Sequence, residues 1–324
     1  MLKKLTSTVK GLVILNCVLS IVIFGLFAFF YSYQNEKAEI QRRAKIVKPV
    51  QKVPEKKFMP NDDDHEEISK MIQQTLGDDA DRFAVYIFRP GRDLTPIIFQ
   101  NRPMRPASMI KMFVLAKAMQ DIKDGKFSLD DDLIVTSENV VGGAGSIAGY
   151  GYNAKVPARL VLEHMIKESD NTATNILIDK VGGLESLNEY LKQKNYSDTN
   201  FEHKMMLAYR GLTNLSSVKD LGELFLKIYN HQCVSDELDR LMIQYLLKQE
   251  DTDCLPTALL FWKIAHKTGE VEMTYHDGGI CYGEKGDFII VFMNDNYTDR
   301  FSTIDKMQRI AKYVADKIDR ERKR

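Results

Sequence analysis

The sequence predicts an α/β protein of the α+β kind, in which an antiparallel five-stranded sheet flanked by helices carries an inserted all-helical lobe, preceded by one transmembrane helix. Three observations predict this architecture. Strand patterns lie only near the two ends of the main domain, at 83–100 and 261–295, and helical patterns fill the stretch between them. Neighbouring strands are joined by short turns, which is typical of an antiparallel sheet. An uncharged apolar run over residues 11–33 precedes the domain.

The apolar run over residues 11–33 is the first element. Its 23 residues contain no charged side chain, and at about 1.5 Å each they reach about 35 Å, enough to cross a hydrocarbon core of roughly 30 Å. Three lysines in residues 1–10 resemble the basic start of a signal peptide, but the run is too long and no small-residue cleavage site follows. We therefore expect an uncleaved membrane anchor, 11–33, behind a short N-terminal tail, 1–10.

Residues 34–62 are basic, contain three prolines and lack apolar periodicity, so they are predicted to form a semi-extended stalk. Residues 1–62 carry a net charge of +7 and the main domain, 63–324, carries −7, so no nucleic-acid partner is predicted. Basic residues after the span outnumber those before it, which by the positive-inside rule favours a cytoplasmic domain. Long domains, however, cross a membrane largely regardless of flanking charge. The chemistry of the domain must therefore decide the topology.

The main domain begins with a helix at 64–76 and a hairpin whose strands are 83–90 and 95–100. The segment 107–124 is apolar around nearly its whole circumference and is followed by Gly125, so we expect a buried central helix. The remaining patterns indicate helices at 157–167, 172–181, 184–193, 217–229, 235–249 and 302–321, and strands at 261–269, 274–283 and 287–295.

The four cysteines of the chain show neither a disulfide scaffold nor the CxxC spacing of a zinc site. Cys233 and Cys254 would lie at opposite ends of the helix at 235–249, which is about 22 Å long, whereas a disulfide needs Cα atoms within roughly 7 Å. We therefore expect free thiols. The six histidines form no H-x-x-x-H pair, so neither a metal nor a cofactor is predicted. His266 and His276 are expected to pack against each other across neighbouring strands.

Ser108 and Lys111 open the buried helix with the spacing S-x-x-K. Residues three apart share a helix face, so the lysine amine can reach the serine hydroxyl. A serine is a weak nucleophile until a base takes its proton, and a lysine desolvated at a helix N-terminus can be that base near neutral pH. The helix dipole adds partial positive charge where an oxyanion would develop. Alone, this motif is a weak signal.

Two further motifs strengthen the prediction that Ser108 is a nucleophile activated by Lys111. S-D-N at 169–171 lies between two predicted helices, 58 residues after Lys111, and K-T-G at 267–269 ends a predicted strand. Together the three motifs are those of class A β-lactamases and penicillin-binding proteins. The stretches MIKESDNTATNILIDKVGG (165–183) and FWKIAHKTGE are similar to this family as well. The sequence thus resembles the class A β-lactamase and D,D-peptidase superfamily over residues 64–320, which implies a β-lactamase/transpeptidase-like fold.

The resemblance implies catalytic roles for four residues. Ser108 is the acylated nucleophile and Lys111 is its proton acceptor. Ser169 relays a proton to the departing nitrogen, and Lys267 supplies positive potential to Ser169 and to the substrate carboxylate. Asp170 is expected to be a structural helix cap and not a catalyst.

The resemblance also implies substrate binding by Asn171, Thr268, Gly269 and Glu270. Asn171 would hydrogen-bond the side-chain amide of the substrate, and Thr268 would donate from its hydroxyl. The backbone N–H groups of Ser108 and Glu270 would form the oxyanion hole.

The sequence departs from the family where class A β-lactamases carry the glutamate that activates the deacylating water. In the family, that glutamate opens an E-x-x-L-N stretch about 36 residues after the serine of S-D-N. At the same distance from Ser169 this sequence has Met205, and Tyr209 stands at the position of the asparagine. Neither residue can hold a hydrolytic water. Glu202 is the nearest carboxylate in the sequence, although a solvated loop acid, or one paired with His203 or Lys204, is the simpler interpretation.

Two further departures weaken the case for efficient penicillin turnover. His276 stands on the strand after K-T-G, where many of these β-lactamases place an arginine for the substrate carboxylate. Glu270 adds a negative charge to a site that normally attracts anions. The glycine-rich segment 141–145 is predicted to be a mobile loop over the cleft.

We therefore expect a membrane-anchored, β-lactamase-like serine hydrolase whose catalytic domain lies outside the cytoplasmic membrane. Its substrate would be a β-lactam or a D-Ala-D-Ala-type peptidoglycan peptide, its deacylation would be slow, and its other partner would be the membrane, through residues 11–33. Two alternatives remain: a true class A β-lactamase with a different deacylating group, and a catalytically weak module that binds or senses wall fragments or β-lactams. The intact Ser-Lys-Ser-Lys set favours an enzyme, because a binding scaffold has no need of a buried lysine.

Overall fold

The computed structural model describes residues 61–208 and 211–321. The predicted tail and transmembrane span, and all but the last two residues of the predicted stalk, lie outside this part of the chain. Among the described residues, no helix is both long and apolar enough to span a bilayer. Asn61 and Asp62, which we assigned to the stalk, hydrogen-bond to the turn after the first strand; the Leu94 N–H donates to Asp62 Oδ1 at 2.9 Å. These two residues therefore belong to the folded domain.

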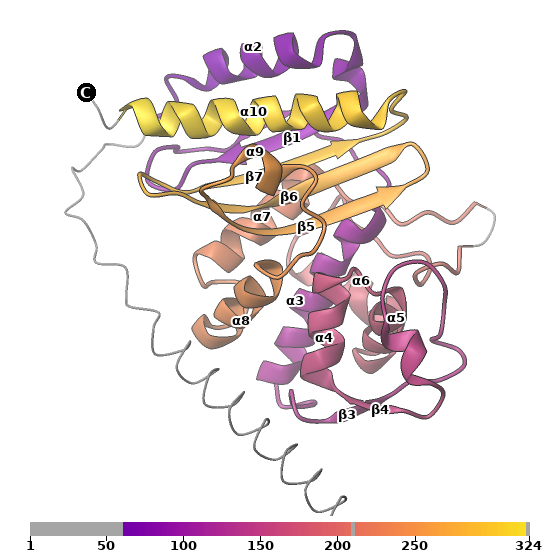
Figure 1. The fold of residues 1–324 in the computed structure, drawn as a ribbon. Coiled ribbons are helices and arrows are strands. Elements are labelled where there is room, and N and C mark those ends of the chain that lie inside the picture. The colour runs from indigo at the N-terminus through magenta and orange to yellow at the C-terminus, as the bar shows by residue number, and fades with distance from the viewer. Residues whose placement is uncertain (1–60, 209–210, 322–324) are drawn as a thin grey trace, which may run out of the picture. The chain divides into compact units, whose positions relative to one another are not determined.

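A five-stranded sheet forms the centre of the fold (Figure 1), and every pair of neighbours in it is antiparallel, in the order β2-β1-β7-β6-β5. The strands are β1 (Phe83–Phe88), β2 (Ile97–Phe99), β5 (Lys263–Val271), β6 (Thr274–Tyr282) and β7 (Phe288–Asn294). The first hairpin and the last three strands come from opposite ends of the domain, and Phe83 pairs with Asn294. The predicted α+β fold with a five-stranded antiparallel sheet is confirmed.

Helices cover both faces of the sheet, and they are α2 (His65–Leu76), α7 (Val218–Tyr229), α9 (Leu255–Ala258) and α10 (Arg300–Glu321). α2 and α10 lie side by side on one face, with α9 next to α10 (Figure 1), while α7 packs against β1, β6 and β7 on the other. Each face has its own buried apolar cluster. Ile72, Ile290 and Ile310 belong to the first, and Leu221 and Val291 belong to the second. The alternation of Ile290 and Val291 between the two clusters follows from the two-residue period of a strand.

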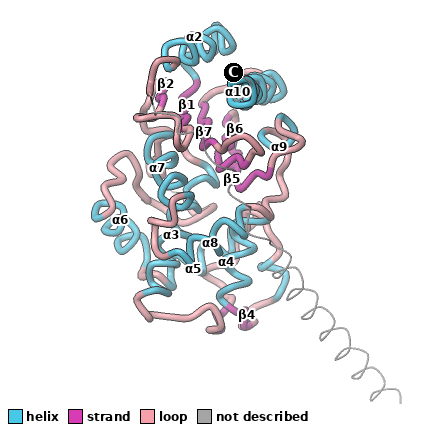
Figure 2. Tube along the Cα trace, turned by 90° about the vertical axis from the view of Figure 1, so that its left-hand side faces the viewer, coloured by secondary structure: helices cyan, strands magenta, loops and turns pink. Residues whose placement is uncertain are grey.

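The helical lobe surrounds α3, and Figure 2 shows its helices gathered below the sheet. They are α3 (Lys111–Lys123), α4 (Ala158–Lys167), α5 (Asn171–Lys180), α6 (Gly183–Gln193) and α8 (Asp236–Leu246). Residues 112–116 of α3 are all fully buried, because α3 contacts α4, α5, α6, α7 and α8. The predicted buried central helix is confirmed.

Several short elements were not predicted. They are η1 (Gly77–Arg82), η2 (Ala107–Ile110), η3 (Ile147–Tyr150), the strand pair β3 (Asp132–Ile134) and β4 (Lys155–Pro157), and α9. Elements of three to six residues are too short for a period to be visible in the sequence. The one that matters for function is η2, because the predicted central helix starts with this 3₁₀ turn, and the turn carries Ser108.

The cysteines in the described part of the chain are free thiols. Cys233, Cys254 and Cys281 are all buried and unpaired with one another. Burial raises the pKa of the Cys233 thiol to about 12 and raises the pKa of the other two well above their usual value. The expectation of free thiols is confirmed for Cys233 and Cys254, and all three are too poorly ionised to be nucleophiles.

Candidate active site

Two lysine side chains meet at the hydroxyl of Ser169. Lys111 Nζ donates to Ser169 Oγ at 3.2 Å, and Lys267 Nζ donates to the same oxygen at 3.0 Å. Both lysines are fully buried, with 0% of their surface exposed. The structure thus brings the lysines of S-x-x-K and K-T-G together around the serine of S-D-N, three groups that lie in α3, in β5 and between α4 and α5.

The backbone at Ser169 explains how its hydroxyl comes to lie there. Ser169 has a φ of +57°, a left-handed conformation that is rare for a residue with a side chain. Asp170 follows as the N-cap of α5: its side chain accepts from Ala173 N–H at 2.7 Å and from Ile147 N–H at 2.7 Å. The predicted structural role of Asp170 is confirmed, and the cap fixes the turn that presents Ser169 to Lys111, which also donates to the Ser169 carbonyl.

Ser108 lies on η2, directly beside the K-T-G strand. A Cβ added to Gly269 would stand 2.8 Å from the Pro106 carbonyl oxygen and 3.0 Å from the Met109 nitrogen, so only a glycine allows β5 to approach η2 this closely. β5 is the edge strand of the sheet, and alternate N–H groups of an edge strand are left without a sheet partner. This places Ser108, half-buried, at the free edge that carries Thr268, Gly269 and Glu270.

The lysines are electrically unusual because they are buried next to each other. Burial lowers the pKa of Lys111 well below its usual value, and the positive charge of Lys267 lowers it further. Burial lowers the pKa of Lys267 to about 7. An amine with a lowered pKa is available as a neutral base near neutral pH. The site can therefore accept a proton at Lys111 while Lys267 provides a titratable charge on the other side of Ser169.

Asn171 is held by contacts within the protein. Its Oδ1 accepts from Lys111 Nζ at 2.8 Å, and its Nδ2 donates to the Gly142 carbonyl at 3.1 Å. Thr172 Oγ1 accepts from the Val141 N–H at 3.2 Å. The glycine-rich loop 141–145 is thus tied to the first turn of α5, beside the lysine.

Met205 is positioned by a residue that the sequence reasoning missed. Asn175 is buried in α5 and holds the Met205 backbone from both sides: its Oδ1 accepts from the Met205 N–H at 2.9 Å, and its Nδ2 donates to the Met205 carbonyl at 3.2 Å. The sequence contains one signal for this role of Asn175: it is an amide in the buried stretch of α5, and a buried amide needs hydrogen-bond partners. We call these two hydrogen bonds the Asn175 clamp. They hold Met205, which has no carboxylate, next to the helix that begins with Asn171.

Glu202 is an exposed loop residue that binds a backbone N–H group. It is exposed, and its Oε2 accepts from the Thr213 N–H at 2.6 Å, which joins the two sides of the loop that contains Met205. Lys204 forms an ion pair with Asp179 at 2.6 Å, so it is not the partner of Glu202. The interpretation of Glu202 as a solvated loop acid agrees with this geometry, whereas the alternative of a pair with Lys204 is wrong. Tyr209 lies outside the described residues.

Glu270 does not present a bare negative charge to the site. Arg300, in the first turn of α10, binds both of its carboxylate oxygens, at 2.8 and 3.0 Å, and stacks 4.8 Å from the centre of the Tyr275 ring. The concern that Glu270 would repel anionic substrates is therefore not supported, because the partner arginine, distant in sequence, compensates its charge.

The expected packing of two histidines against each other is wrong. His266 lies opposite Gly279 and bonds Asp277 at 2.8 Å, whereas His276 lies opposite Gly269 and bonds the Arg105 carbonyl at 2.8 Å. The pairing register, which short-range patterns do not encode, puts them on different rungs of the β5–β6 ladder. Burial lowers the pKa of His276 to about 4, so it stays neutral and does not replace an arginine.

Two groups of side chains in the described residues could offer ligands to a metal ion: Asp62, His65 and Asp93, and His164, Glu168 and Asp170. Their carboxylates already have protein partners. Asp93 accepts from Arg89, and Asp170 caps α5.

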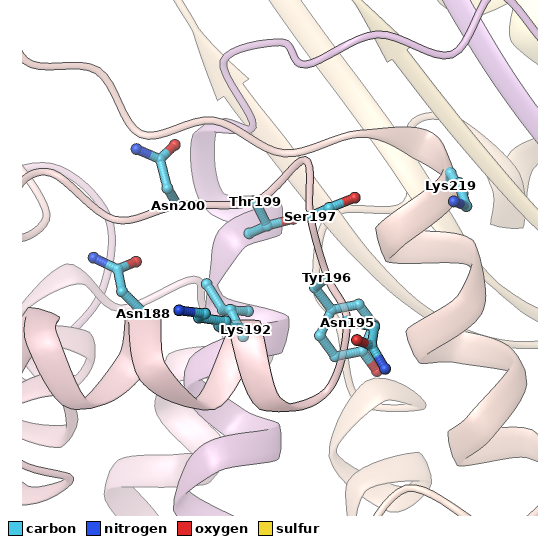
Figure 3. A pocket seen from close by; sticks show the side chains of 9 residues that line it. Asn188, Lys192, Asn195, Tyr196, Ser197, Thr199, Asn200 and Lys219 are labelled. Atoms are coloured by element: carbon cyan, nitrogen blue, oxygen red, sulfur yellow. The ribbon is translucent and has the colours of Figure 1, made fainter.

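A separate hollow of about 640 Å³ lies between α6 and the first turn of α7, and Figure 3 shows the polar side chains around it. The lining residues are Asn188, Leu191, Lys192, Asn195, Tyr196, Ser197, Thr199, Asn200 and Lys219. None of the motif residues lines this hollow, so it is distinct from the site around Ser169.

Comparison with known proteins gives a family match over most of the chain. Residues 67–318 match the model of the beta-lactamase enzyme family. Among curated proteins, the extended-spectrum beta-lactamase PER-1 of Pseudomonas aeruginosa is 24% identical over 195 residues. That alignment covers 55% of this chain and 61% of the relative, so the chain matches less than two thirds of that protein's length.

Solved structures share the fold. PBP-A is 24% identical, with a TM-score of 0.72, and the match covers 78% of this chain and 96% of that one. A PBP-A mutant, solved as an acyl-enzyme complex with penicillin G, also gives a TM-score of 0.72 at 24% identity, with coverages of 79% and 97%. A beta-lactamase from Sphaerobacter thermophilus gives 0.69 at 20% identity, with coverages of 80% and 98%.

Proposed function

Because the chain belongs to the beta-lactamase enzyme family, we propose that it is a membrane-anchored serine hydrolase that forms an acyl-enzyme on Ser108. Its substrates are β-lactams or D-Ala-D-Ala-type wall peptides. The observation that carries the proposal is the convergence of Lys111 and Lys267 on Ser169, at 3.2 and 3.0 Å. Ser108 lies on η2, which packs against the strand that carries Lys267. Relatives named as a beta-lactamase and as a penicillin G acyl-enzyme support the substrate class.

Acylation begins when Ser108 Oγ attacks the substrate carbonyl carbon and its proton passes to neutral Lys111 Nζ. The negative charge that develops on the carbonyl oxygen is stabilised by the backbone N–H groups of Ser108 and Glu270. The carbon–nitrogen bond then breaks and Ser169 Oγ delivers its proton to the departing nitrogen. Lys111 Nζ, which donates to Ser169 Oγ at 3.2 Å, returns to it the proton taken from Ser108. Lys267 stabilises the Ser169 oxygen and the substrate carboxylate. Asn171 and Thr268 bind the substrate, and Gly269 lets the strand lie close to the nucleophile.

Deacylation is slow in this proposal. Met205 occupies the position at which the class A pattern has a glutamate, and Glu202 is occupied with the Thr213 N–H. An attacking water then has no positioned carboxylate base, which typically costs about 10²–10⁴-fold in rate, or roughly 3–5 kcal/mol of barrier. The acyl-enzyme therefore persists.

The proposed location of the catalytic domain is outside the cytoplasmic membrane, with residues 11–33 as the anchor. The chemistry supports it, because wall peptides and β-lactams are met there. A reporter fused after Arg324 should be active only outside the cytoplasm. Activity restricted to the cytoplasm would contradict the proposed topology.

The first prediction tests the acyl-enzyme. A fluorescent penicillin should label the wild type on Ser108, and Ser108→Ala should abolish the label, as followed by mass spectrometry. Ser197→Ala, which changes an exposed serine away from the motifs, is the control and should label normally. A chromogenic cephalosporin should give a burst near one equivalent and then a slow steady state. Label on the alanine variant would refute the nucleophile, and turnover of many per second without a burst would indicate a working β-lactamase with another deacylating group.

A further inference from the structure

Three large apolar side chains are exposed at one end of the sheet. Phe261 is 97% exposed, Leu260 is 75% exposed and Leu94 is 66% exposed. Leu260 and Phe261 come from the turn between α9 and β5, and Leu94 comes from the turn after β1. We call these three residues the apolar end. Exposed apolar side chains gathered at one end of a domain are typical of a surface that contacts a protein or a membrane.

The two turns lie on either side of the β6–β7 turn. A Cβ added to Gly283 would stand 2.5 Å from the Trp262 ring, and one added to Gly286 would stand 3.8 Å from Arg92 Nε. Lys263, the first residue of β5, pairs with Tyr282. The residues next to the apolar end are thus joined through the 283–286 turn, at the end of the sheet where α10 also finishes (Figure 1).

The described chain enters the domain at this same end. The Asn61 N–H donates to the Arg92 carbonyl at 2.9 Å, and Asp62 accepts from the Leu94 N–H at 2.9 Å. The 60 residues ahead of Asn61 contain the uncharged apolar run 11–33. The run 11–33 is therefore connected in sequence, through residues 34–60, to the end of the domain that exposes Phe261.

The surroundings of the apolar end are those of an interfacial surface. Trp262 packs edge-on against Phe288, with 5.2 Å between the ring centres. Lys263 is exposed next to it, and Lys285, on the β6–β7 turn, lies 3.8 Å from Asp319. Tryptophan and lysine beside exposed leucine and phenylalanine are typical of groups that sit at the level of lipid headgroups.

We propose that the apolar end rests on the lipid bilayer, with Leu260 and Phe261 inserted among the upper parts of the acyl chains and Leu94 beside them. This inference rests on the membrane anchor of the proposed function. It goes further, because it fixes which face of the domain meets the membrane. A lipid surface is favoured over a second copy of the chain because the chain enters at this end.

The experiment uses Trp262, which is the only tryptophan of the chain. The full chain is reconstituted in phosphatidylcholine vesicles, with and without bromine atoms on the acyl chains, and Trp262 fluorescence is recorded. Brominated lipid should quench the wild type clearly, because quenching needs near contact. Phe261→Ser should lose at least half of that quenching. Phe301→Ser, which removes a 79% exposed phenylalanine from the start of α10, is the matched control and should quench like the wild type.

Each outcome bears on the proposal. Vesicle-bound wild type without quenching would overturn the bilayer contact while leaving the anchor intact, as would quenching that Phe261→Ser does not reduce. Wild type that does not float with the vesicles would instead refute the anchor, and with it the inference that rests on it. Concentration-dependent association lost in Phe261→Ser, without lipid quenching, would assign the apolar end to a second copy. Both variants change exposed side chains, and circular dichroism checks that they are folded.

Discussion

At the scale of single residues, the site depends on two amines buried beside one hydroxyl. Lys111 and Lys267 both donate to Ser169 Oγ, and two like charges so close disfavour each other. Their proximity and burial together lower the pKa of Lys111. The same residue type on the surface would be protonated and useless as a base, so burial is what turns this lysine into a proton acceptor.

The prediction at this scale concerns the base. Lys111→Arg should slow covalent labelling by penicillin by about 10²–10⁴-fold, because an arginine keeps a positive charge but cannot give up its proton. Lys117→Arg is the matched control: Lys117 is also buried in α3, paired with Asp121, and its replacement should leave labelling close to wild type. The labelling rate is measured by mass spectrometry and folding by thermal unfolding. An equal loss of labelling rate in both variants would show that any arginine in the buried α3 disturbs the site, and would contradict the role of Lys111 as the base.

At the scale of elements, α5 organises the loops around the lysines. Asp170, Asn171 and Thr172 bind the loop at 141–147, and Asn175 binds the Met205 backbone. Hydrogen bonds from one buried helix thus hold two loops that would otherwise be free to move. The loop conformations follow from the first turn of α5.

One prediction at the scale of elements tests the packing of the glycine-rich loop on Asp170. Gly145 has a φ of +109°, and a Cβ there would stand 2.1 Å from Asp170 Cγ. Gly145→Ala should therefore lower the free energy of unfolding by more than about 1 kcal/mol and slow acylation. Gly149→Ala is the control, because a Cβ at Gly149 meets nothing within 4 Å, and it should change stability by less than about 1 kcal/mol. Urea unfolding of both variants decides; equal stabilities would show that the loop yields freely.

Another prediction at this scale uses the Asn175 clamp. Because the clamp already fixes the Met205 backbone, Met205→Glu should bring a carboxylate to the acyl-enzyme and accelerate the slow phase. The gain should stay well below the about 10²–10⁴-fold of a fully positioned base, because Tyr209 lacks the asparagine amide that would orient the water. Met205→Gln, which has the same length but no base, should leave the slow phase unchanged. Equal steady-state rates for the two variants would mean that the loop does not aim position 205 at the ester.

At the scale of the whole molecule, the two buried lysines oppose folding. In the unfolded chain they bind protons with their usual pKa of 10.5, whereas in the folded chain the pKa of Lys267 is about 7. Between these values the unfolded state holds the extra proton, so the free energy of unfolding rises with pH. The helical lobe and the sheet provide the apolar burial that keeps the amines in place.

The prediction at the scale of the whole molecule follows from the sign of this pH dependence. From pH 7 to 8.5, the stability of the wild type relative to Lys267→Met should increase, with a limiting slope of about 1.4 kcal/mol per pH unit for one proton. Urea unfolding at several pH values measures this difference, which cancels the titration of groups that do not interact with Lys267. A difference that stays flat or falls with pH would mean that Lys267 remains protonated in the folded protein.

Much of this protein followed from local patterns in its sequence. The central strands and the buried α3 are visible as apolar runs, because β1, β6 and β7 are buried on both faces and α3 is buried nearly all round. The other main helices are visible as apolar faces that repeat about every 3.6 residues. The order of the S-x-x-K, S-D-N and K-T-G motifs indicated the family, which the match over residues 67–318 confirms. The spacing after Ser169 also indicated that Met205 stands where the family has a glutamate.

Only the tertiary structure decided which charges meet. Arg300 lies 30 residues from Glu270 yet compensates it, and His276 and His266 fall on different rungs because the ladder register is set by the whole sheet. Lys111 and Lys267 are ordinary lysines in the sequence, and their pKa values are lowered by burial in the folded domain. There they meet Ser169, which is 58 residues from Lys111 and 98 from Lys267. Hydrophobic periodicity is local and can be read from neighbours, whereas desolvation and ion pairing depend on which distant segments share a space.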